Sequence, residues 1–172
     1  MGYIMVDIES DGPIPGDFSM ISFGAVFVDE ELDKTFLGKL KPISEKFIPE
    51  ALAVSGYSRE ETLAFEEPQK VMTEFANWVK ETCKDRPIFI SDNNGFDWMF
   101  VCWYFHHFTG SNPFGFSSQN LGSLYKGIEK DTFKTFKHLR QTRHSHNPVD
   151  DAKGNAEALL ILKKEYGLKI KF

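Results

Sequence analysis

The sequence predicts an α/β domain in which helices flank a mixed β-sheet. Three strand-like segments open the chain, and helix-like and strand-like segments alternate after them. The chain has 172 residues, enough for one domain with its own core, and no repeat, linker or low-complexity segment divides it. We therefore expect a single domain over residues 1–172.

The first third of the chain favours an antiparallel meander followed by a short helix. Residues 3–8 and 21–28 are short runs rich in β-branched and aromatic side chains, which is typical of strands. The acidic turn at 29–33 separates the second run from a third expected strand at 34–41. Residues 49–54 then favour a short helix that begins with a proline.

The rest of the chain alternates between helical and extended patterns. Pro68 opens a helix in which apolar side chains recur every three or four positions. The further expected elements are a buried strand at 87–90, an aromatic-rich helix at 97–108, a loop at 109–118, a partly helical segment at 121–139 and a last helix that starts between Pro148 and Asp151 and stops at Tyr166 and Gly167.

Composition argues against several classes of protein. No stretch approaches the roughly 20 apolar residues of a membrane span, and the first residues lack the basic region of a signal peptide. Cys83 and Cys102 form no Cys/His cluster, which argues against a structural zinc site. We expect a cytoplasmic protein with no membrane partner and with both thiols reduced.

The net charge of −5 is only weak evidence against a nucleic-acid partner, because the distribution of charge matters more than its sum. Basic side chains outnumber acidic ones between residues 121 and 144. They are Lys126, Lys130, Lys134, Lys137, Arg140 and Arg143, against Glu129 and Asp131. On one helix the four lysines would share a face, which is either a solvated surface or a track for a phosphate backbone.

The first candidate functional feature is a pair of acids at the end of the first strand. Asp7 and Glu9 are two positions apart, so on a strand they share a face about 6.5–7 Å apart, while Ile8 points into the packing. Two carboxylates at that spacing can ligate one metal ion or two neighbouring ions. The alternative is a pair of surface acids at a strand end.

The second feature is Asp97, which follows the expected strand at 87–90 and starts the aromatic-rich helix. Open α/β sheets place their sites at the carboxyl ends of strands, so a carboxylate here is a candidate ligand. The alternative is a helix N-cap, a common use of aspartate.

The third feature is a histidine before an aspartate pair at the start of the last helix. His146 lies on the approaching loop, and Pro148 stiffens the path from it to Asp151. One of Asp150 and Asp151 is expected to cap the helix while the other ligates metal. Gly154 costs a helix interior about 1 kcal/mol, which suggests close approach of another backbone or of substrate. The alternative is a surface histidine before an acidic helix start, which the helix dipole favours.

Together these features resemble the three motifs of the DEDDh 3′–5′ exonucleases, the family of proofreading exonucleases, oligoribonuclease and RNase T. Asp7-x-Glu9 resembles the first motif, Asn93-x-x-Phe96-Asp97 the second, and His146-x4-Asp151 with Ala152 the third. The resemblance covers residues 4 to about 162 and implies a ribonuclease H-like mixed sheet flanked by helices. Asp92 is a departure, since many relatives carry histidine there, and it competes with Asp97 as a ligand.

The resemblance also implies a division of roles within the site. Asp7 would bridge two divalent cations, Glu9 and Asp151 would complete one cation site, and Asp97 would hold the second, partly through water. Oxygen-only ligands favour Mg²⁺ or Mn²⁺ over zinc. His146 would act as general base toward the attacking water.

Family resemblance further implies a single-stranded nucleic-acid substrate whose free 3′ end is held in a closed pocket. Ser10, Phe18 and Trp98 are the candidate contacts, with Met20 beside them; ordinary core packing is the alternative for the three larger side chains. The loop at 112–118 and the stretch at 137–160 resemble a small stand-alone subfamily of exoribonuclease-like proteins, which favours RNA over DNA.

Three further alternatives stay open on the sequence alone. One is a metal-dependent phosphodiesterase that acts on short oligonucleotides or dinucleotides. Another is a non-catalytic nucleic-acid-binding module that has kept the fold. Relatives often pair, so a homodimer through the helix at 98–108 and the loop at 112–118 is a third expectation, although core packing explains most of these rings.

Overall fold

The computed structural model describes residues 1–170 and contains a five-stranded sheet in the order β3-β2-β1-β4-β5. The elements in chain order are β1 (Gly2–Ser10), β2 (Met20–Phe27), β3 (Thr35–Lys39), α1 (Pro49–Val54), α2 (Arg59–Leu63), α3 (Pro68–Thr82), β4 (Pro87–Ser91), α4 (Asn94–Thr109), β5 (Ser118–Asn120), α5 (Leu121–Glu129), η1 (Lys137–Leu139) and α6 (Pro148–Glu165).

The sheet is mixed, as predicted. β1, β2 and β3 form the antiparallel meander, whose short connections allow only that direction, while β1, β4 and β5 run parallel. The two parallel pairs are joined through helices, which is the usual route for a parallel crossover. The predicted α/β class is therefore confirmed.

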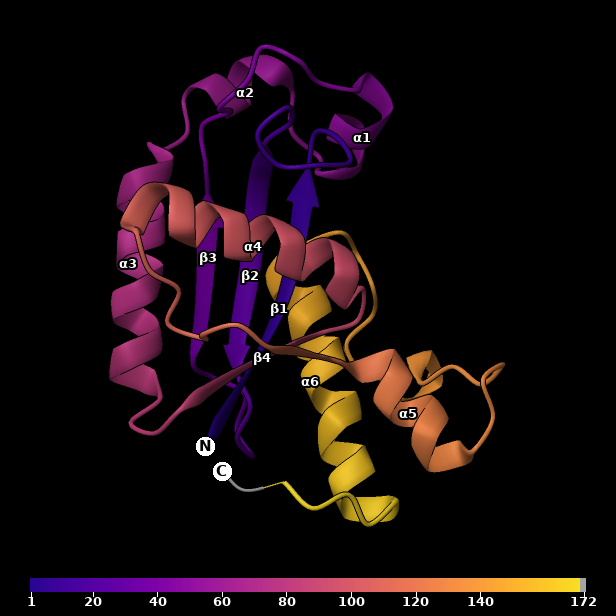
Figure 1. Ribbon diagram of the computed structural model, residues 1–172. Coiled ribbons are helices and arrows are strands. Elements are labelled where there is room, and N and C mark those ends of the chain that lie inside the picture. The colour runs from indigo at the N-terminus through magenta and orange to yellow at the C-terminus, as the bar shows by residue number, and fades with distance from the viewer. Residues whose placement is uncertain (171–172) are drawn as a thin grey trace.

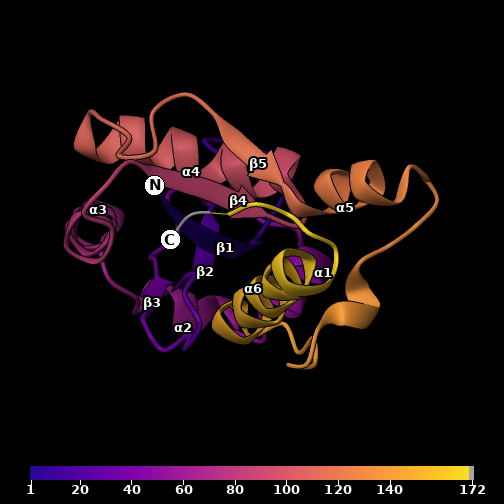
Figure 2. The same cartoon turned by 90° about the horizontal axis from the view of Figure 1, so that it is seen from below.

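The two faces of the sheet carry separate cores. On β1, Val6 and Ile8 pack with α3 and α4, whereas Met5 packs with α6 on the opposite face. Figures 1 and 2 show α4 on one side of the sheet and α6 on the other. Because side chains alternate along a strand, Asp7 and Glu9 share the face of Met5 and point toward the α6 side.

Two short elements, α2 and β5, lie outside the predicted ones. α2 follows Ser58, whose side chain and that of Glu61 form a capping box, a signal that is readable in the sequence. β5 lies at the end of the expected loop at 109–118 and consists of three polar residues. It forms because the edge of β4 offers it a ladder, with Phe89 paired to Ser118.

The prediction of one basic helical face over 121–139 is wrong. α5 ends at Glu129 because Lys130 adopts a left-handed conformation with φ of +54°. Lys134 and Lys137 therefore lie beyond the helix, on a loop and on the short η1 turn. No helix within residues 1–170 has both the length and the apolar character needed to cross a membrane.

Candidate active site

Three carboxylates from distant parts of the chain meet at one end of the sheet. Asp7 and Glu9 lie toward the end of β1, and Asp151 lies in the first turn of α6. One carboxylate oxygen of each lies within 4.8 Å of the other two. Folding thus joins the first and third sequence features into one acidic group.

Asp97 lies beside this group, in the first turn of α4, and is only 3% exposed. The Ser91 side chain and the Ile8 backbone hydrogen-bond to its carboxyl group. Its Oδ2 atom, however, is buried and has no hydrogen-bond partner among the described residues. A buried carboxylate oxygen without a partner is costly, so this atom calls for a proton or a cation.

Burial and mutual repulsion raise the pKa of these carboxyl groups. Burial raises the pKa of Glu9 to about 7, with a further contribution from Asp151. Burial likewise raises the pKa of Asp97 to about 7, and the Ser91 hydrogen bond partly offsets it. For Asp7 the pKa lies well above its usual value, because burial acts together with the charges of the neighbouring acids. Divalent cations would relieve this repulsion, so the donor set fits a metal site.

The raised pKa values predict that the metal-free protein loses stability as the pH rises from about 4 to about 7. In this window the unfolded chain has already released the Glu9 and Asp97 protons while the folded chain still binds them, so the free energy of unfolding falls. Glu9 alone contributes up to roughly 3 kcal/mol of that loss.

Calorimetric melting between pH 4 and pH 8 in EDTA, for the wild type and for Glu9→Gln, tests this linkage. We expect the wild type to lose more stability than the variant over that range, and Mn²⁺ to restore it at pH 7. Parallel curves for the two proteins would contradict the assigned pKa of Glu9.

Asp92, the competing ligand, is engaged elsewhere. Its Oδ2 accepts a hydrogen bond from the Arg140 guanidinium at 2.9 Å, and Arg140 also lies over the Phe136 ring at 5.2 Å. Within residues 1–170, neither Asp92 nor Asp97 belongs to the group of acids with atoms within 4.8 Å of one another, but only Asp92 of the two is held in an ion pair. Asp97, with its unpartnered buried oxygen, is the better placed of the two.

His146 stands on the loop that leads into α6. Its Nδ1 lies 3.7 Å from Glu9 Oε1, its side chain is about half exposed, and its backbone is left-handed with φ of +60°. The backbone N–H groups of Ser145 and His146 donate to the two oxygens of Asp151 at 2.9 and 3.0 Å. Asp151 thereby fixes the loop that carries the imidazole.

The expected capping by an aspartate is not what the structure shows. Asn147 caps α6, since its Oδ1 accepts from the N–H groups of Val149 and Asp150. Asp151 turns back toward the loop instead.

His144 lies closer to the site than its sequence spacing suggests. His144 is two residues farther from Asp151 along the sequence than His146 is, which argues against it as a site residue. In the structure, however, His144 Nδ1 lies 2.9 Å from Asp151 Oδ2. Its ring also packs edge-on against that of His146, with centroids 4.5 Å apart. The spacing argument fails because the left-handed residue at 146 folds the loop back on itself, which residue counting cannot anticipate.

Two glycines allow α6 to approach its neighbours closely. Gly24 pairs with Asp7 across the sheet, and a Cβ built on it would lie 2.3 Å from the backbone of Pro148. A Cβ on Gly154 would lie 2.9 Å from the Thr142 carbonyl oxygen, so the predicted close backbone approach there is confirmed. Gly24 therefore sets how near the start of α6, and with it Asp151, comes to Asp7.

Gly24→Ala is expected to lower cleavage activity by at least about tenfold and to destabilise the fold by about 1–3 kcal/mol, because the new methyl group pushes α6 away from β1. Gly127→Ala is the matched control, since a Cβ there meets nothing within 4 Å. Denaturant melts and initial cleavage rates of both variants measure the effect. Equal activity of the two variants would show that Gly24 does not position the site.

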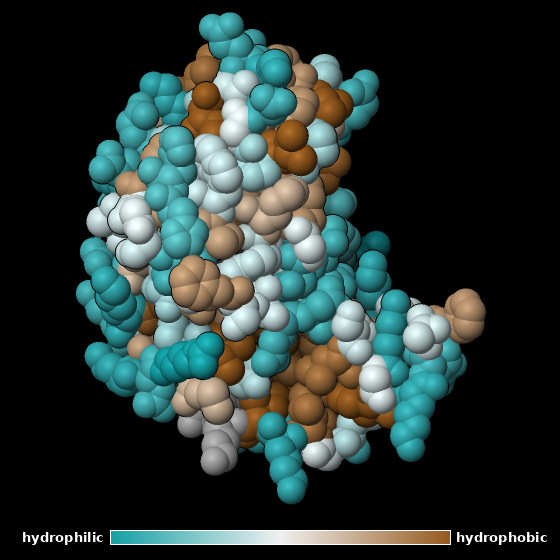
Figure 3. All heavy atoms as spheres, in the orientation of Figure 1, coloured by the Kyte–Doolittle hydropathy of each residue, from teal (hydrophilic) through white to brown (hydrophobic). Residues whose placement is uncertain are grey.

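An apolar pocket of about 360 Å³ opens next to Glu9. Its lining is Glu9, Ser10, Gly12, Pro13, Ile48, Ala51, Val54 and Phe96. Apolar atoms gather over α1 near the upper end of the molecule in Figure 3, where Ile48 and Val54 are 38% and 44% exposed. Of these lining residues, only Glu9 and Ser10 are candidate site residues on the sequence, and Phe96 appears there only as part of the second motif. Its place in the second motif could have identified Phe96 as a pocket residue. The apolar composition of so short a helix could have identified α1 in the same way.

A buried ion pair holds one wall of this pocket. Asp11, with no exposed surface, accepts from Arg59 Nη1 at 2.9 Å and from the Ser19 backbone, and its own carbonyl oxygen accepts from the N–H of Ile48. Burial raises the pKa of Asp11, and Ser19 and Arg59 partly offset the rise. These contacts tie the end of β1 to the segments on either side of α1.

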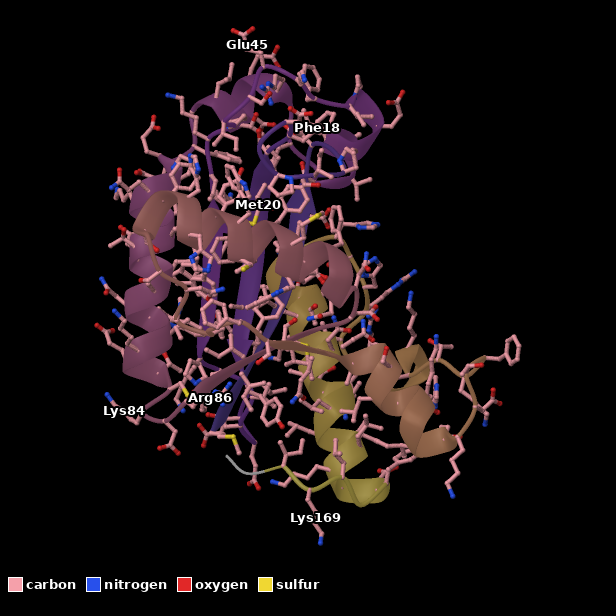
Figure 4. All side chains as sticks on the ribbon, in the orientation of Figure 1. Phe18, Met20, Glu45, Lys84, Arg86 and Lys169 are labelled. Atoms are coloured by element: carbon pink, nitrogen blue, oxygen red, sulfur yellow. The ribbon has the colours of Figure 1, made fainter. Side chains whose placement is uncertain are left out.

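The three predicted substrate contacts lie at different places. Ser10 lines the pocket, with its hydroxyl donating to the Gly12 carbonyl oxygen at 2.7 Å. Phe18 is half-buried against Gly12, on the loop above Met20 in Figure 4. Trp98 instead packs edge-on against Phe89 and lines a separate hollow on α4.

Met20 belongs to the core. It has no exposed surface, and its backbone N–H donates to the Tyr104 hydroxyl at 2.8 Å.

Comparison with known proteins places the chain among exonucleases. It is 35% identical over 172 residues to the 3′–5′ DNA exonuclease Cap18 of Escherichia coli, an alignment that covers 94% of this chain and 91% of that protein. No protein-family model matches the chain.

Solved structures share the fold. E. coli exonuclease I in complex with a dT13 oligonucleotide has a TM-score of 0.75 at 16% identity, covering 96% of this chain and 42% of that one. A 3′-exonuclease that recognises a histone mRNA stem-loop has a TM-score of 0.76 at 16% identity, covering 98% of this chain and 66% of that one. The chain thus spans less than two thirds of the length of either. These likenesses confirm the ribonuclease H-like fold, and the 35% identical relative shows that the chain belongs to the 3′–5′ exonucleases.

Proposed function

We propose that the protein removes nucleotides from the 3′ end of single-stranded nucleic acid with two divalent cations, Mg²⁺ or Mn²⁺, held by Asp7, Glu9, Asp97 and Asp151. The observation that carries the proposal is the group of three carboxylates within 4.8 Å, beside the unpartnered buried oxygen of Asp97. The engagement of Asp92 by Arg140 favours Asp97 as the fourth ligand.

Divalent cations supply the positive charge that a phosphodiester needs at its centre and lower the pKa of an attacking water. The carboxylates present only oxygen donors, which suit Mg²⁺ or Mn²⁺. Asp7, whose pKa is raised by burial and by the charges of all three other acids, would hold the cations together with them.

His146 is the proposed general base. Its exposed imidazole, 3.7 Å from Glu9, lies where a water beside the carboxylates would be within reach. As the water oxygen bonds to phosphorus, the imidazole takes its proton, the bond from phosphorus to the 3′ oxygen breaks, and that oxygen is protonated from solvent. The products are a nucleoside 5′-monophosphate and a shortened strand.

The apolar pocket beside Glu9 is the proposed seat of the 3′-terminal nucleotide. Phe96 offers a ring and α1 offers aliphatic side chains to a base, directly next to the carboxylates. Ser10 and Gly12 line the pocket, and the Phe18 side chain packs against Gly12. Trp98 is a weaker candidate, since it faces a different hollow.

We propose single-stranded DNA as the substrate. The resemblance to exoribonuclease-like proteins favours RNA, but the 35% identical relative is named a DNA exonuclease. The homodimer stays a prediction; α4 still presents partly exposed Trp98 and Trp103 on its outer side.

Matched DNA and RNA oligonucleotides, labelled at the 3′ or the 5′ end and incubated with Mg²⁺ or with EDTA, test the proposal. We expect Mg²⁺-dependent release of mononucleotides from the 3′ label, faster from DNA. Release from the 5′ label would reject the polarity, and faster release from RNA would reject the sugar preference. Cleavage restricted to dinucleotides favours the phosphodiesterase alternative, and binding without cleavage in Mg²⁺ favours the non-catalytic one.

A further inference from the structure

Phe133 places an aromatic ring almost wholly in water. The side chain is 95% exposed, and among the described large hydrophobic residues only Phe116, at 92%, is comparable. Phe133 lies in the segment 121–139, here called the α5 lobe, which projects from the body of the molecule in Figure 1. A single exposed ring is common on protein surfaces, so its surroundings decide whether it has a role.

The turn that presents this ring is built by specific hydrogen bonds. Lys130 adopts a left-handed conformation at the end of α5, and its N–H and that of Asp131 donate back to the last turn of the helix. The carboxylate of Asp131 accepts from the Phe133 N–H at 2.9 Å. Phe136, with 1% exposure, anchors the segment that follows. The ring is therefore held outward by an ordered turn.

The segment that carries the ring also carries four lysines. Lys126, Lys130, Lys134 and Lys137 are all exposed. Lys134 forms an ion pair with Glu129 at 3.2 Å, whereas the other three have no ion pair within 4 Å among residues 1–170. The outer edge of the lobe is mostly hydrophilic in Figure 3. An aromatic ring on the same segment as unpaired lysines suits a polymer that carries both stacking rings and phosphates.

The lobe is also connected to the active site. The chain leaves η1 through Arg140, which is fixed to Asp92, passes the exposed Arg143 and reaches His146. In Figure 1 the loop from the lobe runs up to the start of α6, on the side of the molecule where α4 begins. A nucleic-acid strand that leaves the site along this loop would meet cationic side chains before it reached the lobe.

We propose that the α5 lobe binds the single strand upstream of its 3′ end, with Phe133 stacked on a base and Lys126, Lys130 and Lys137 beside its phosphates. The inference rests on the proposed function for the placement of the 3′ end. It adds a second contact region that only substrates long enough to span both places can use. The lobe then selects for strand length without any part in the chemical step.

Two phenylalanine variants test the stacking contact. Phe133→Ala removes the proposed ring, and Phe116→Ala is the matched control, an equally exposed phenylalanine on the loop before β5. Fluorescence anisotropy in EDTA measures binding of single-stranded DNA from about 3 to about 16 nucleotides. Steady-state cleavage of the same oligonucleotides in Mg²⁺ separates KM from kcat.

We expect Phe133→Ala to weaken binding of the longest strands about tenfold, with a matching rise in KM, and to leave the shortest strands and kcat unchanged. Phe116→Ala should behave as the wild type at every length. Equal loss at all lengths, loss in both variants, or no loss in either overturns the proposal. Failure of the wild type to cleave any oligonucleotide would reject the proposed function instead, while the binding series still tests the lobe.

The lysines are tested by the salt dependence of binding. Lys130→Gln with Lys137→Gln should lower the slope of log affinity against log salt for long strands by about 1–2, since each phosphate contact contributes about 0.7. Lys84→Gln with Lys169→Gln is the control of equal charge, because neither residue belongs to the lobe; Lys84 lies at the lower left and Lys169 at the bottom of the molecule in Figure 4. An unchanged slope in the lobe variant, or an equal change in the control, counts against the lobe as a binding surface for nucleic acid.

Discussion

Asp7→Asn is expected to abolish metal binding and to lower cleavage by at least about 10³-fold, while it makes the metal-free protein more stable. The carboxylate of Asp7 has a pKa well above its usual value because it is buried and faces three other acids. Its replacement by an amide removes that repulsion but also removes a proposed metal ligand. Loss of activity together with a gain in stability is the signature of a ligand, whereas a misfolded variant loses both.

Calorimetric titration with Mn²⁺, thermal melting in EDTA and initial cleavage rates in Mg²⁺ measure the three parts of this prediction. Asp150→Asn is the matched control, because Asp150 is next to Asp151 but lies outside the group of close carboxylates. We expect the control to keep metal affinity and activity. Full activity of Asp7→Asn in Mg²⁺ would reject the whole site.

His146→Ala is expected to lower turnover by about 10²–10⁴-fold while metal affinity stays near normal, because His146 is the proposed general base and is not one of the proposed ligands. His146→Asn serves as a second variant, since asparagine tolerates the left-handed backbone at this position better than alanine. Agreement between the two variants separates loss of the base from a change in the loop.

His144→Ala provides the discriminating comparison. His144 contacts Asp151 directly, so removal of its side chain tests whether His144 and His146 share the role of general base. A large drop in kcat for His144→Ala with little change for His146→Ala would transfer the proposed base role to His144. Loss of Mn²⁺ affinity in His146→Ala equal to its loss of turnover would also contradict the assignment.

Local patterns determined most of the fold. The meander, the helices that begin at Pro49 and Pro68, the strand at Pro87 and the last helix all follow from periodicity, proline and glycine, which act over a few residues. β5 was missed because three polar residues carry no pattern, and a neighbouring strand makes them extended. The break after Glu129 was missed because a lysine takes a left-handed conformation there, which no composition rule signals.

The sequence by itself named the candidate site residues: acids two apart on a strand, an acid at a helix start, and a histidine before an acidic helix. Spacing alone could not decide between Asp92 and Asp97, or find the contact of His144 with Asp151. Those answers depend on partners distant along the chain: Arg140 engages Asp92, and Gly24 lets α6 approach β1. Charge state, burial and unpaired oxygens are properties of what surrounds a side chain, so only the tertiary structure decides them.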